Sequence, residues 1–551
     1  MPPEARPIEP KTDRGATMVD HADLIFTGGR VHTVNAANDI AEAVAVGGGR
    51  ILAVGSNAAV RPLAGPGTRV VELRGRSLLP GLIDAHAHFA GLGAAMAAID
   101  CKAPGMQSIR ALQEAVRRRA AELPPGTWIR GRGYDQSRLA ERRHPTRDDW
   151  DAVAPHHPVI FTRTCGHICS VNSLAMTLAG VDDATPDPPG GRYERADGRN
   201  LGVAYETAQA PLQQAAALSP AEYREALLRA DRAYLAAGAT SVHDAGGLTG
   251  PAFGPCQELV GAGELHVRLY AFVTVNSRQH PLLGLLPSGV RTGFGDDRLR
   301  LGAFKVITDG SSSGPTAATR APYTSNPADC GILYWQQEEL DELIGRAHRA
   351  GWQCTVHAVG DRAIEQTLDA MAHAQHEAPR QGLRHRIEHC GICPPDLQAR
   401  VAAQGVIPVM QPAFFWEFGD GYIRNYGRER ADTMFPVRSL LARGVPVAGS
   451  SDAPVTDHRP LFGVQQTLTR VTMDGDVCGP QERVDLTAAL RLYTVNAAYA
   501  AFEEDRKGSI EPGKLADLVM LAEDITCVPA ERLRDVAVLM TVVGGEVVYE
   551  A

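Results

Sequence analysis

Residues 79–88 constrain the chain most, because an apolar run there leads into two histidines spaced two apart, in the sequence LPGLIDAHAH. In a β-strand, side chains at positions i and i+2 point to the same face, so His86 and His88 would project together from the end of the strand. Two neutral imidazoles on one face form half of a metal site. The alternative is two structural histidines at a loop edge.

Composition narrows the class of protein. The chain has 551 residues, of which 44% are hydrophobic and 22% charged, as is ordinary for a large globular enzyme. The net charge of -9 argues against a nucleic-acid-binding surface. No apolar run approaches the length that crosses a membrane. Residues 1–20 are polar and rich in proline, without the apolar segment of a signal peptide. We therefore predict a cytoplasmic protein with a disordered tail over residues 1–20.

The cysteine content agrees with the predicted cytoplasmic location. Ten cysteines are scattered along the chain, and without a secretion signal we expect them to be reduced. Cys390 and Cys393 form a C-x-x-C motif, but no second pair follows at the spacing of a zinc ribbon. We interpret these two residues as ordinary thiols.

The two ends of the chain share one pattern. Residues 21–79 and 507–551 alternate apolar and polar residues in short runs broken by glycine, which is typical of antiparallel strands. Because chain ends often lie close together, the pattern predicts one small β-sandwich built from both termini.

The middle of the chain, residues 80–506, alternates strand-like apolar runs with helical stretches rich in Ala, Leu, Glu and Arg. The strand-like runs are LLPGLIDAHAH, PVIFTRTCGH, TSVHDAGG, RLGAFKVITDG, QCTVHAVGD, RIEHC, GVIPVMQP and VPVAGSSDAP. Eight such units predict an α/β protein with a (β/α)8 barrel. We interpret the surplus segments near residues 101–150 and 181–204 as insertions near the barrel mouth.

Chemistry in such barrels sits at the carboxyl ends of the strands. The residues found there are His86 and His88, then His167, His243 with Asp244, Lys305, His357, His389 and Asp452. Histidine makes up only 18 of 551 residues, so its repeated placement at strand ends favours a metal site over chance.

Several longer motifs occur together and in a fixed order. They are PGLIDAHAHF, RTCGHICSVNS, FKVITDGSSSGPTAA, VHAVGDRAI, RIEHC and SSDAPV. In combination they resemble the amidohydrolase superfamily, metal-dependent hydrolases on a (β/α)8 barrel with a small β-sandwich. The pattern is most similar to the amidohydrolase-3 or YtcJ-like branch, which includes N-substituted formamide deformylases. One departure is Cys165-Gly166-His167, where many relatives have Asp-Gly-His, and it leaves the substrate open.

The resemblance implies two divalent metal ions. Their ligands would be His86, His88 and Asp452 for the more buried ion, His357 and His389 for the second, and Lys305 as a bridge. A lysine ammonium repels a dication, so the bridging role requires a carbamate that Lys305 forms with carbon dioxide. The alternative is an ion-paired Lys305 in a one-metal site. Histidine-rich sites with mixed nitrogen and oxygen ligands suit zinc best.

The resemblance also implies a reaction, the hydrolysis of a non-peptide C–N bond of an amide or N-substituted formamide by a metal-activated hydroxide. Asp452 would act as general base and then as general acid. His167 and His243 are candidates to stabilise the oxyanion, and packed histidines are the alternative for each. We expect three further side chains to orient ligands or cap loops, namely Asp309, Asp361 and Arg386.

An aromatic segment, QPAFFWEFGDGYIRNY at residues 411–426, stands out in a chain with only 6% aromatic residues. It begins at the predicted catalytic mouth, so we expect it to line the pocket of an apolar or aromatic small-molecule substrate. The candidate residues are Phe414, Phe415, Trp416 and Arg424. Glycines 419 and 421 predict a break in any single helix here. A helix whose aromatic face packs on the barrel is the alternative.

Other functions stay open on the same site. A carbamate or cyclic-imide hydrolase, or a deaminase, would use the same ligands. A non-catalytic scaffold requires missing ligands, and every expected ligand type is present. We expect a small-molecule substrate and neither nucleic acid nor membrane as a partner, and a homodimer stays open.

Overall fold

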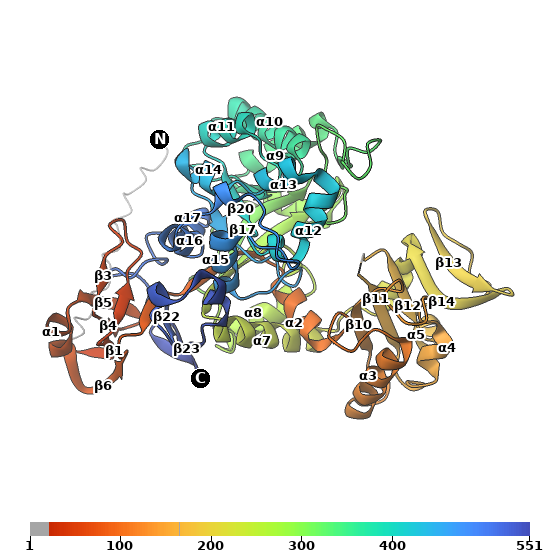
Figure 1. The fold of residues 1–551 in the computed structure, drawn as a ribbon, viewed down its shortest axis with the longest axis horizontal. Coiled ribbons are helices and arrows are strands. Elements are labelled where there is room, and N and C mark those ends of the chain that lie inside the picture. Colours follow the sequence, from red (N-terminus) through yellow and green to blue (C-terminus); the bar gives the residue numbers. More distant parts are fainter. Residues whose placement is uncertain (1–20, 165) are drawn as a thin grey trace, which may run out of the picture.

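The structure, a computed structural model, describes residues 21–164 and 166–551 (Figure 1). The tail predicted over residues 1–20, and Cys165, lie outside the described residues. Within the described ranges, every helix is too short or too polar to pass through a membrane.

An eight-stranded parallel sheet forms the centre of the molecule, and its strands follow one another in sequence order. They are β8 (Leu82–Ala87), β15 (Ala239–Asp244), β16 (Arg268–Val275), β17 (Leu299–Ile307), β18 (Cys354–Ala358), β19 (Arg386–His389), β20 (Ile407–Met410) and β21 (Ala448–Gly449). Helices connect them, among them α7 (Pro220–Ala236), α8 (Phe253–Gly261), α9 (Gln337–Arg349), α10 (Asp361–Glu377), α11 (Pro395–Gln404) and α14 (Val437–Ala442). The predicted (β/α)8 barrel is confirmed.

One of the eight predicted barrel strands was wrong. The run PVIFTRTCGH contains β11 (Val159–Arg163), which belongs to a different sheet, and β16 takes its place in the barrel. Both runs are short, apolar and rich in aromatic and β-branched residues. Periodicity identifies such runs as strands but does not say which sheet each one joins.

The second sheet builds a lobe beside the barrel, drawn in orange to yellow in Figure 1. Its strands, in spatial order, are β13 (Gly191–Ala196), β14 (Arg199–Glu206), β12 (Ile168–Val171), β11, β10 (Ile129–Tyr134) and β9 (Ile99–Asp100). Helices α3 (Ile109–Glu122), α4 (Arg147–Asp151) and α5 (Ser173–Leu178) accompany them. The two predicted insertions are therefore parts of one lobe, which also includes residues 151–180.

The lobe leaves the barrel after α2 (Phe89–Ala97), and side chains of the lobe contact residues at the barrel mouth. The Lys102 Nζ lies 3.2 Å from an oxygen of Glu417, and the Arg132 guanidinium donates to the Pro454 carbonyl at 3.5 Å. Glu417 lies on the helix after β20 and Pro454 lies just after β21, so both contacts are at the carboxyl ends of barrel strands.

The two chain ends form two further sheets, of which the first contains N-terminal strands alone and the second combines strands from both ends. One has the order β5 (Arg50–Gly55), β4 (Ala43–Gly47), β1 (Ala22–Thr27), β6 (Ala64–Glu72). The other has the order β24 (Glu546–Glu550), β23 (Val538–Val543), β22 (Leu518–Leu521), β7 (Ser77–Pro80), β2 (Arg30–His32), β3 (Ile40–Ala41). A single apolar cluster joins them, with Phe26 and Val44 from the first sheet and Leu518 and Met540 from the second.

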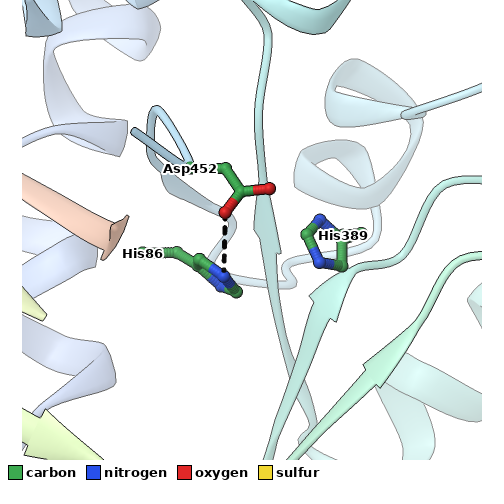
Figure 2. A group of neighbouring side chains, drawn as sticks. All are labelled: His86, His389 and Asp452. Carbon is green, nitrogen blue, oxygen red and sulfur yellow. Dashed lines mark ion pairs between the residues drawn. The ribbon is translucent and has the colours of Figure 1, made fainter. Parts of the chain in front are cut away.

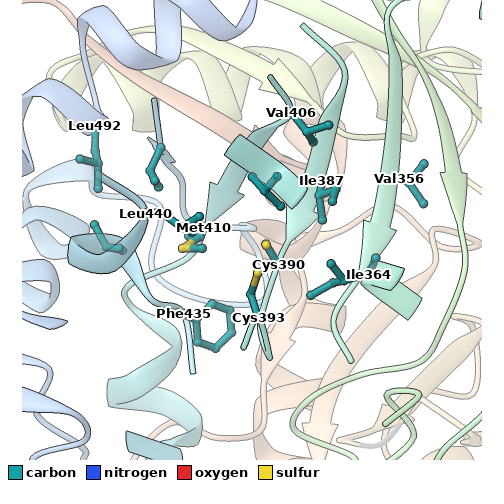
Figure 3. Close-up of a cluster of buried hydrophobic side chains, with 14 of the residues drawn as sticks. Val356, Ile364, Ile387, Cys390, Cys393, Val406, Met410, Phe435, Leu440 and Leu492 are labelled. Atoms are coloured by element: carbon teal, nitrogen blue, oxygen red, sulfur yellow. The ribbon is translucent and has the colours of Figure 1, made fainter. Parts of the chain in front are cut away.

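The largest apolar cluster packs helices onto the later barrel strands (Figure 3). Val356 and Ile387 come from β18 and β19, and Phe435 packs with them. Cys390 and Cys393 lie in the same cluster as buried free thiols, which confirms their interpretation as ordinary thiols.

The aromatic segment forms one continuous helix, α12 (Phe414–Tyr426), so the predicted break at glycines 419 and 421 was wrong. A glycine costs only about 1 kcal/mol relative to alanine inside a helix, and packing can offset that. At Gly419 the reason is close approach, because a Cβ there would come within 2.5 Å of Thr472 Cγ2.

A buried ion pair ties the barrel to the sandwich. The Arg268 guanidinium on β16 donates to both carboxylate oxygens of Asp517, which precedes β22, at 2.7 and 2.9 Å. The Gly544 N–H also donates to this carboxylate, at 2.8 Å. Such a pair is costly to break, because the remaining partner becomes an unpaired buried charge.

We predict that Asp517→Ala lowers the free energy of unfolding by about 3–5 kcal/mol, the cost of an unpaired buried charge. Urea titration followed by circular dichroism measures the change. The matched control is Glu550→Ala, which breaks the exposed pair with Arg69 and should leave the unfolding midpoint unchanged. Equal stability of Asp517→Ala and wild type would show that the pair does not hold the two parts together.

Candidate metal centre

The first and last barrel strands meet at a seam that places three of the predicted ligands. The backbone N–H of Asp452 donates to the His86 carbonyl, and the N–H of His88 donates to the Ala453 carbonyl, each at 2.8 Å. Below them, the Asp84 carboxylate accepts hydrogen bonds from the Ser451 N–H at 3.0 Å and from the Ser451 hydroxyl. The bonds that close the barrel thus bring His86 and His88 to Asp452.

His86, His389 and Asp452 form a buried cluster whose ligand atoms lie within 4.8 Å of one another (Figure 2). Asp452 Oδ1 lies 3.5 Å from His86 Nε2 and 3.2 Å from His88 Nε2. The His389 ring centroid lies 5.0 Å from that of His86 and 4.5 Å from that of His357. The cluster therefore combines residues that the sequence assigned to two different ions.

The backbone is strained at two of these positions. His389 has a φ of 74° and Asp452 a φ of 56°, in the left-handed region that residues other than glycine seldom adopt. Each follows or ends a barrel strand, so the turn there aims its side chain across the mouth. Strain of this kind persists where the surrounding structure enforces it, as at binding sites.

Hydrogen bonds fix which nitrogen of each imidazole faces the cluster. Nδ1 of three histidines points outward to an oxygen that only accepts. The partners are the Glu388 carboxylate for His86, the Gly246 carbonyl for His88 at 2.9 Å and the Gln411 side-chain oxygen for His389 at 2.8 Å. The proton therefore resides on Nδ1, and each Nε2 presents a lone pair to the cluster. His357 is turned the other way, since its Nε2 donates to the Gly310 carbonyl at 3.1 Å.

Asp452 Oδ1 is buried and has no hydrogen-bond partner among residues 21–164 and 166–551. In the neutral form of each ring, the Nε2 atoms of His86 and His88 that face it carry lone pairs of their own. Three electron-rich atoms around one point repel one another unless a cation lies between them. The donor set of two imidazole nitrogens and a carboxylate oxygen fits a divalent transition-metal ion.

The protonation states suit metal binding. Burial holds the pKa of His86 and of His357 well below its usual value, and neutral imidazole is the form that binds metal. Burial raises the pKa of Asp452, but the neighbouring imidazoles of His88, His86 and His389 outweigh it and leave that pKa well below its usual value. For His88, burial lowers the pKa, but Asp452 raises it by more, so a metal ion would have to displace a proton there.

Lys305 lies on β17, only 3% exposed. Burial lowers the pKa of its amine, and the charges of Glu388 and Asp452 offset this only in part. Among the described residues, no carboxylate comes within 4.0 Å of its nitrogen, which disfavours the simple ion-paired lysine.

Glu388 orients His86 and was not among the site residues predicted from the sequence. Glu388 is fully buried between His86 and Arg386. The Arg386 guanidinium donates to the Glu388 carboxylate at 2.8 and 3.1 Å. The Thr355 hydroxyl donates to it as well. Carboxylates in this position fix the tautomer and the angle of a ligating histidine. The available signal was the pair Arg386 and Glu388, two opposite charges spaced two apart and so on one face of a short strand.

The other two predicted orienting residues cap loops. Asp309 accepts backbone N–H groups of Ala318, Val359 and Gly360 at 2.9 to 3.0 Å, and burial raises its pKa to about 7. Asp361 accepts the backbone N–H of Arg320 at 2.7 Å. Both join the loop after β17 to the one after β18.

His243 and His167 both lie outside the cluster of His86, His389 and Asp452, and each has other partners. His243 is fully buried on β15, with Nδ1 3.2 Å from the Arg386 guanidinium and its ring against Tyr270. His167 precedes β12 in the lobe, where its side chain is 66% exposed and pairs with Glu206 at 2.9 Å. Its predicted place at a barrel strand end was wrong, because β11 belongs to the lobe.

Of the four predicted pocket residues, only Phe414 contacts the cluster. Its ring stacks on His389, with centroids 6.0 Å apart. Phe415 packs into the core against Phe435, and Trp416 lies against Phe462, so the helix also has the packed aromatic face of the alternative prediction. Arg424 is exposed on α12.

Comparison with known proteins identifies the family of the chain. The model of the amidohydrolase family matches residues 69–549. The chain is 32% identical to the N-substituted formamide deformylase of Arthrobacter pascens, over 97% of this chain and 99% of that one. It is 29% identical to the putative amidohydrolase YtcJ of Bacillus subtilis (strain 168), over 96% and 99%. A crystal structure of an uncharacterized metal-dependent hydrolase from Pyrococcus furiosus superposes with a TM-score of 0.77 at 26% identity, covering 91% of this chain and 99% of that one. The chain thus belongs to the amidohydrolase family.

Proposed function

We propose that the protein is a metal-dependent hydrolase of a non-peptide C–N bond in an amide or N-substituted formamide. The observation that carries the proposal is the buried Asp452 Oδ1, which faces two imidazole nitrogens and has no hydrogen bond among the described residues. The similarity to a protein named N-substituted formamide deformylase supports the formamide class.

The proposed ligands follow from the contacts at the barrel mouth. His86, His88 and Asp452 would hold one ion, which we take to be zinc because the set is rich in imidazole. His357 and His389, whose rings are in contact, would hold a second. When bound, such ions lower the pKa of a water molecule to produce a hydroxide nucleophile, and they polarise the scissile carbonyl.

Asp452 is the proposed proton carrier. The histidines around it keep its carboxylate ionised, so it can accept the proton of an attacking water. The same carboxyl group can then deliver that proton to the leaving nitrogen, which departs as an amine. Asp452 sits on a strained turn at the seam, which fixes its position during both transfers.

Lys305 is the proposed bridge between the ions. Its buried amine has a lowered pKa, which favours the neutral nucleophile that adds to carbon dioxide. The addition of carbon dioxide to this neutral amine forms an N–C bond and releases one proton, which leaves an anionic carbamate with two oxygen donors.

Phe414 would shape the substrate pocket. Its ring lies directly against His389, so an apolar or aromatic substituent next to the scissile bond would contact it. Trp416 lies two positions further along α12 and packs against Phe462 and the Arg534 guanidinium instead.

The metal content tests the proposal. We predict about two divalent ions per chain in the wild type, as in two-metal hydrolases. The double variant His86→Ala with His88→Ala should lose one ion and all measurable hydrolysis, as mass spectrometry of the metals and a formamide assay would show. The matched control is His373→Ala, an exposed histidine on α10. Wild-type metal content and activity in the double variant would refute the site.

The carbamate has its own test. We predict that Lys305→Ala lowers turnover by more than about 10²-fold, because metal bridging supplies several kcal/mol of charge stabilisation. Short carboxylic acids added to this variant should restore part of the activity by occupying the bridge. Lys305→Arg is the control, since it fills the space and should show no rescue. Wild-type turnover in Lys305→Ala would rule out a bridging role.

The pocket is tested with two substrates of different size. We predict that Phe414→Leu raises KM for N-benzylformamide about tenfold, the value of losing part of an aromatic contact, and changes KM for N-methylformamide little. Trp416→Leu is the matched control and should behave like the wild type. If Trp416→Leu had the larger effect, the pocket would lie on the other side of α12.

A further inference from the structure

A cavity of about 250 Å³ lies at the end of the barrel opposite to the metal centre. Three of its lining residues start or precede barrel strands, namely Arg300 on β17, Gln353 before β18 and Arg384 before β19. The same three strands carry Lys305, His357 and His389 near their other ends. At 3.3 Å per residue, Arg384 lies about 16 Å from His389, so this cavity is separate from the proposed active site.

The cavity is strongly basic. Four arginines line it, and no carboxylate is among the described lining residues. The four are Arg291, Arg300, Arg380 and Arg384. Two of them are paired with carboxylates from outside the lining, Arg300 with Glu503 at 3.1 Å and Arg384 with Glu504 at 2.6 Å. Such a concentration of positive charge is unusual in a chain with a net charge of -9.

The other two guanidiniums have no counter-charge in the described part of the chain. Arg380 donates only to main-chain carbonyls, those of His348 at 2.6 Å and of Gly351 and Trp352 at 3.2 Å. The guanidinium of Arg291, an exposed residue, makes no hydrogen bond or ion pair within residues 21–164 and 166–551, and its stem packs on Gly351. Burial lowers the pKa of Arg380, and the positive charge of Arg291 lowers it further. Both arginines line the same cavity, so their positive charges face one space.

Phe502 supplies an apolar wall. Its ring is 37% exposed and lines the cavity, with the Arg384 guanidinium stacked 4.7 Å above it. Its φ of 60° is in the left-handed region, which is unfavourable for a bulky aromatic residue. The surrounding turn thus holds the ring at the cavity at an energetic cost.

We propose that this cavity is a binding site for a small organic anion, with its phosphate or carboxylate group between Arg291 and Arg380 and its apolar part against Phe502. Guanidinium groups bind such oxyanions through paired, charge-assisted hydrogen bonds. The anion would also balance the positive charges of the two arginines. The site goes beyond the proposed hydrolysis and does not depend on it.

Isothermal titration of the metal-loaded protein tests the site with phenyl phosphate, benzoate and inorganic phosphate as probes. Phenyl phosphate or benzoate should bind with a stoichiometry of about one, and whichever binds more tightly identifies the oxyanion. Arg291→Ala should weaken binding about tenfold, the value of one charge-assisted hydrogen bond. Phe502→Ala should weaken binding of the aromatic probes but not that of inorganic phosphate. Arg346→Ala, which removes an exposed arginine on α9 outside the cavity, is the matched control.

A repeat of the titration with the His86→Ala, His88→Ala double variant distinguishes binding in the cavity from binding at the metal centre. The anion site predicts unchanged binding of the probes to that variant. Loss of binding there would assign the probes to the metal centre and overturn the proposal. Equal affinity of Arg291→Ala and wild type, or no binding of any probe to the wild type, would overturn it as well.

Discussion

The seam between the first and last barrel strands is the constraint on which the site depends. Two backbone hydrogen bonds, from Asp452 to His86 and from His88 to Ala453, close the barrel and at the same time set the ligands side by side. Asp84 holds the layer below through Ser451 and the Tyr234 hydroxyl. Residues from opposite ends of the barrel sequence thus meet only when the barrel is closed, which links metal binding to correct folding.

Around that seam, hydrogen-bond acceptors of the protein fix the position of the ring proton on three histidines. Glu388, the Gly246 carbonyl and Gln411 each take the outer N–H of one histidine, so the inner nitrogens carry lone pairs. Arg386 in turn balances the charge of Glu388 deep in the barrel. This arrangement explains why the charged residues Arg386 and Glu388 are buried inside the barrel. They set the orientation and basicity of the ligands.

The barrel, the terminal strands and the ligand types could be predicted from local patterns. His-x-His at a strand end and the strand–helix alternation depend only on neighbours in sequence. The sheet to which β11 belongs could not be predicted from local patterns, because strand partners are set by long-range contacts. The predicted place of His167 was wrong for the same reason. Glu388 was missed because its spacing from Arg386 indicates a shared face of the strand but not its distant partner His86. The continuous helix α12 shows tertiary packing at Gly419 overriding a local glycine signal.

The central claim is that a divalent ion lies between Asp452 Oδ1 and the Nε2 atoms of His86 and His88. Anomalous diffraction from crystals of the purified, active protein, recorded above and below the zinc absorption edge, measures this directly. The account predicts an anomalous peak within about 2.0–2.2 Å of all three atoms, the usual zinc distance to nitrogen and oxygen ligands. Full hydrolytic activity from crystals that show no peak there, at the zinc edge or that of any other transition metal, would contradict it.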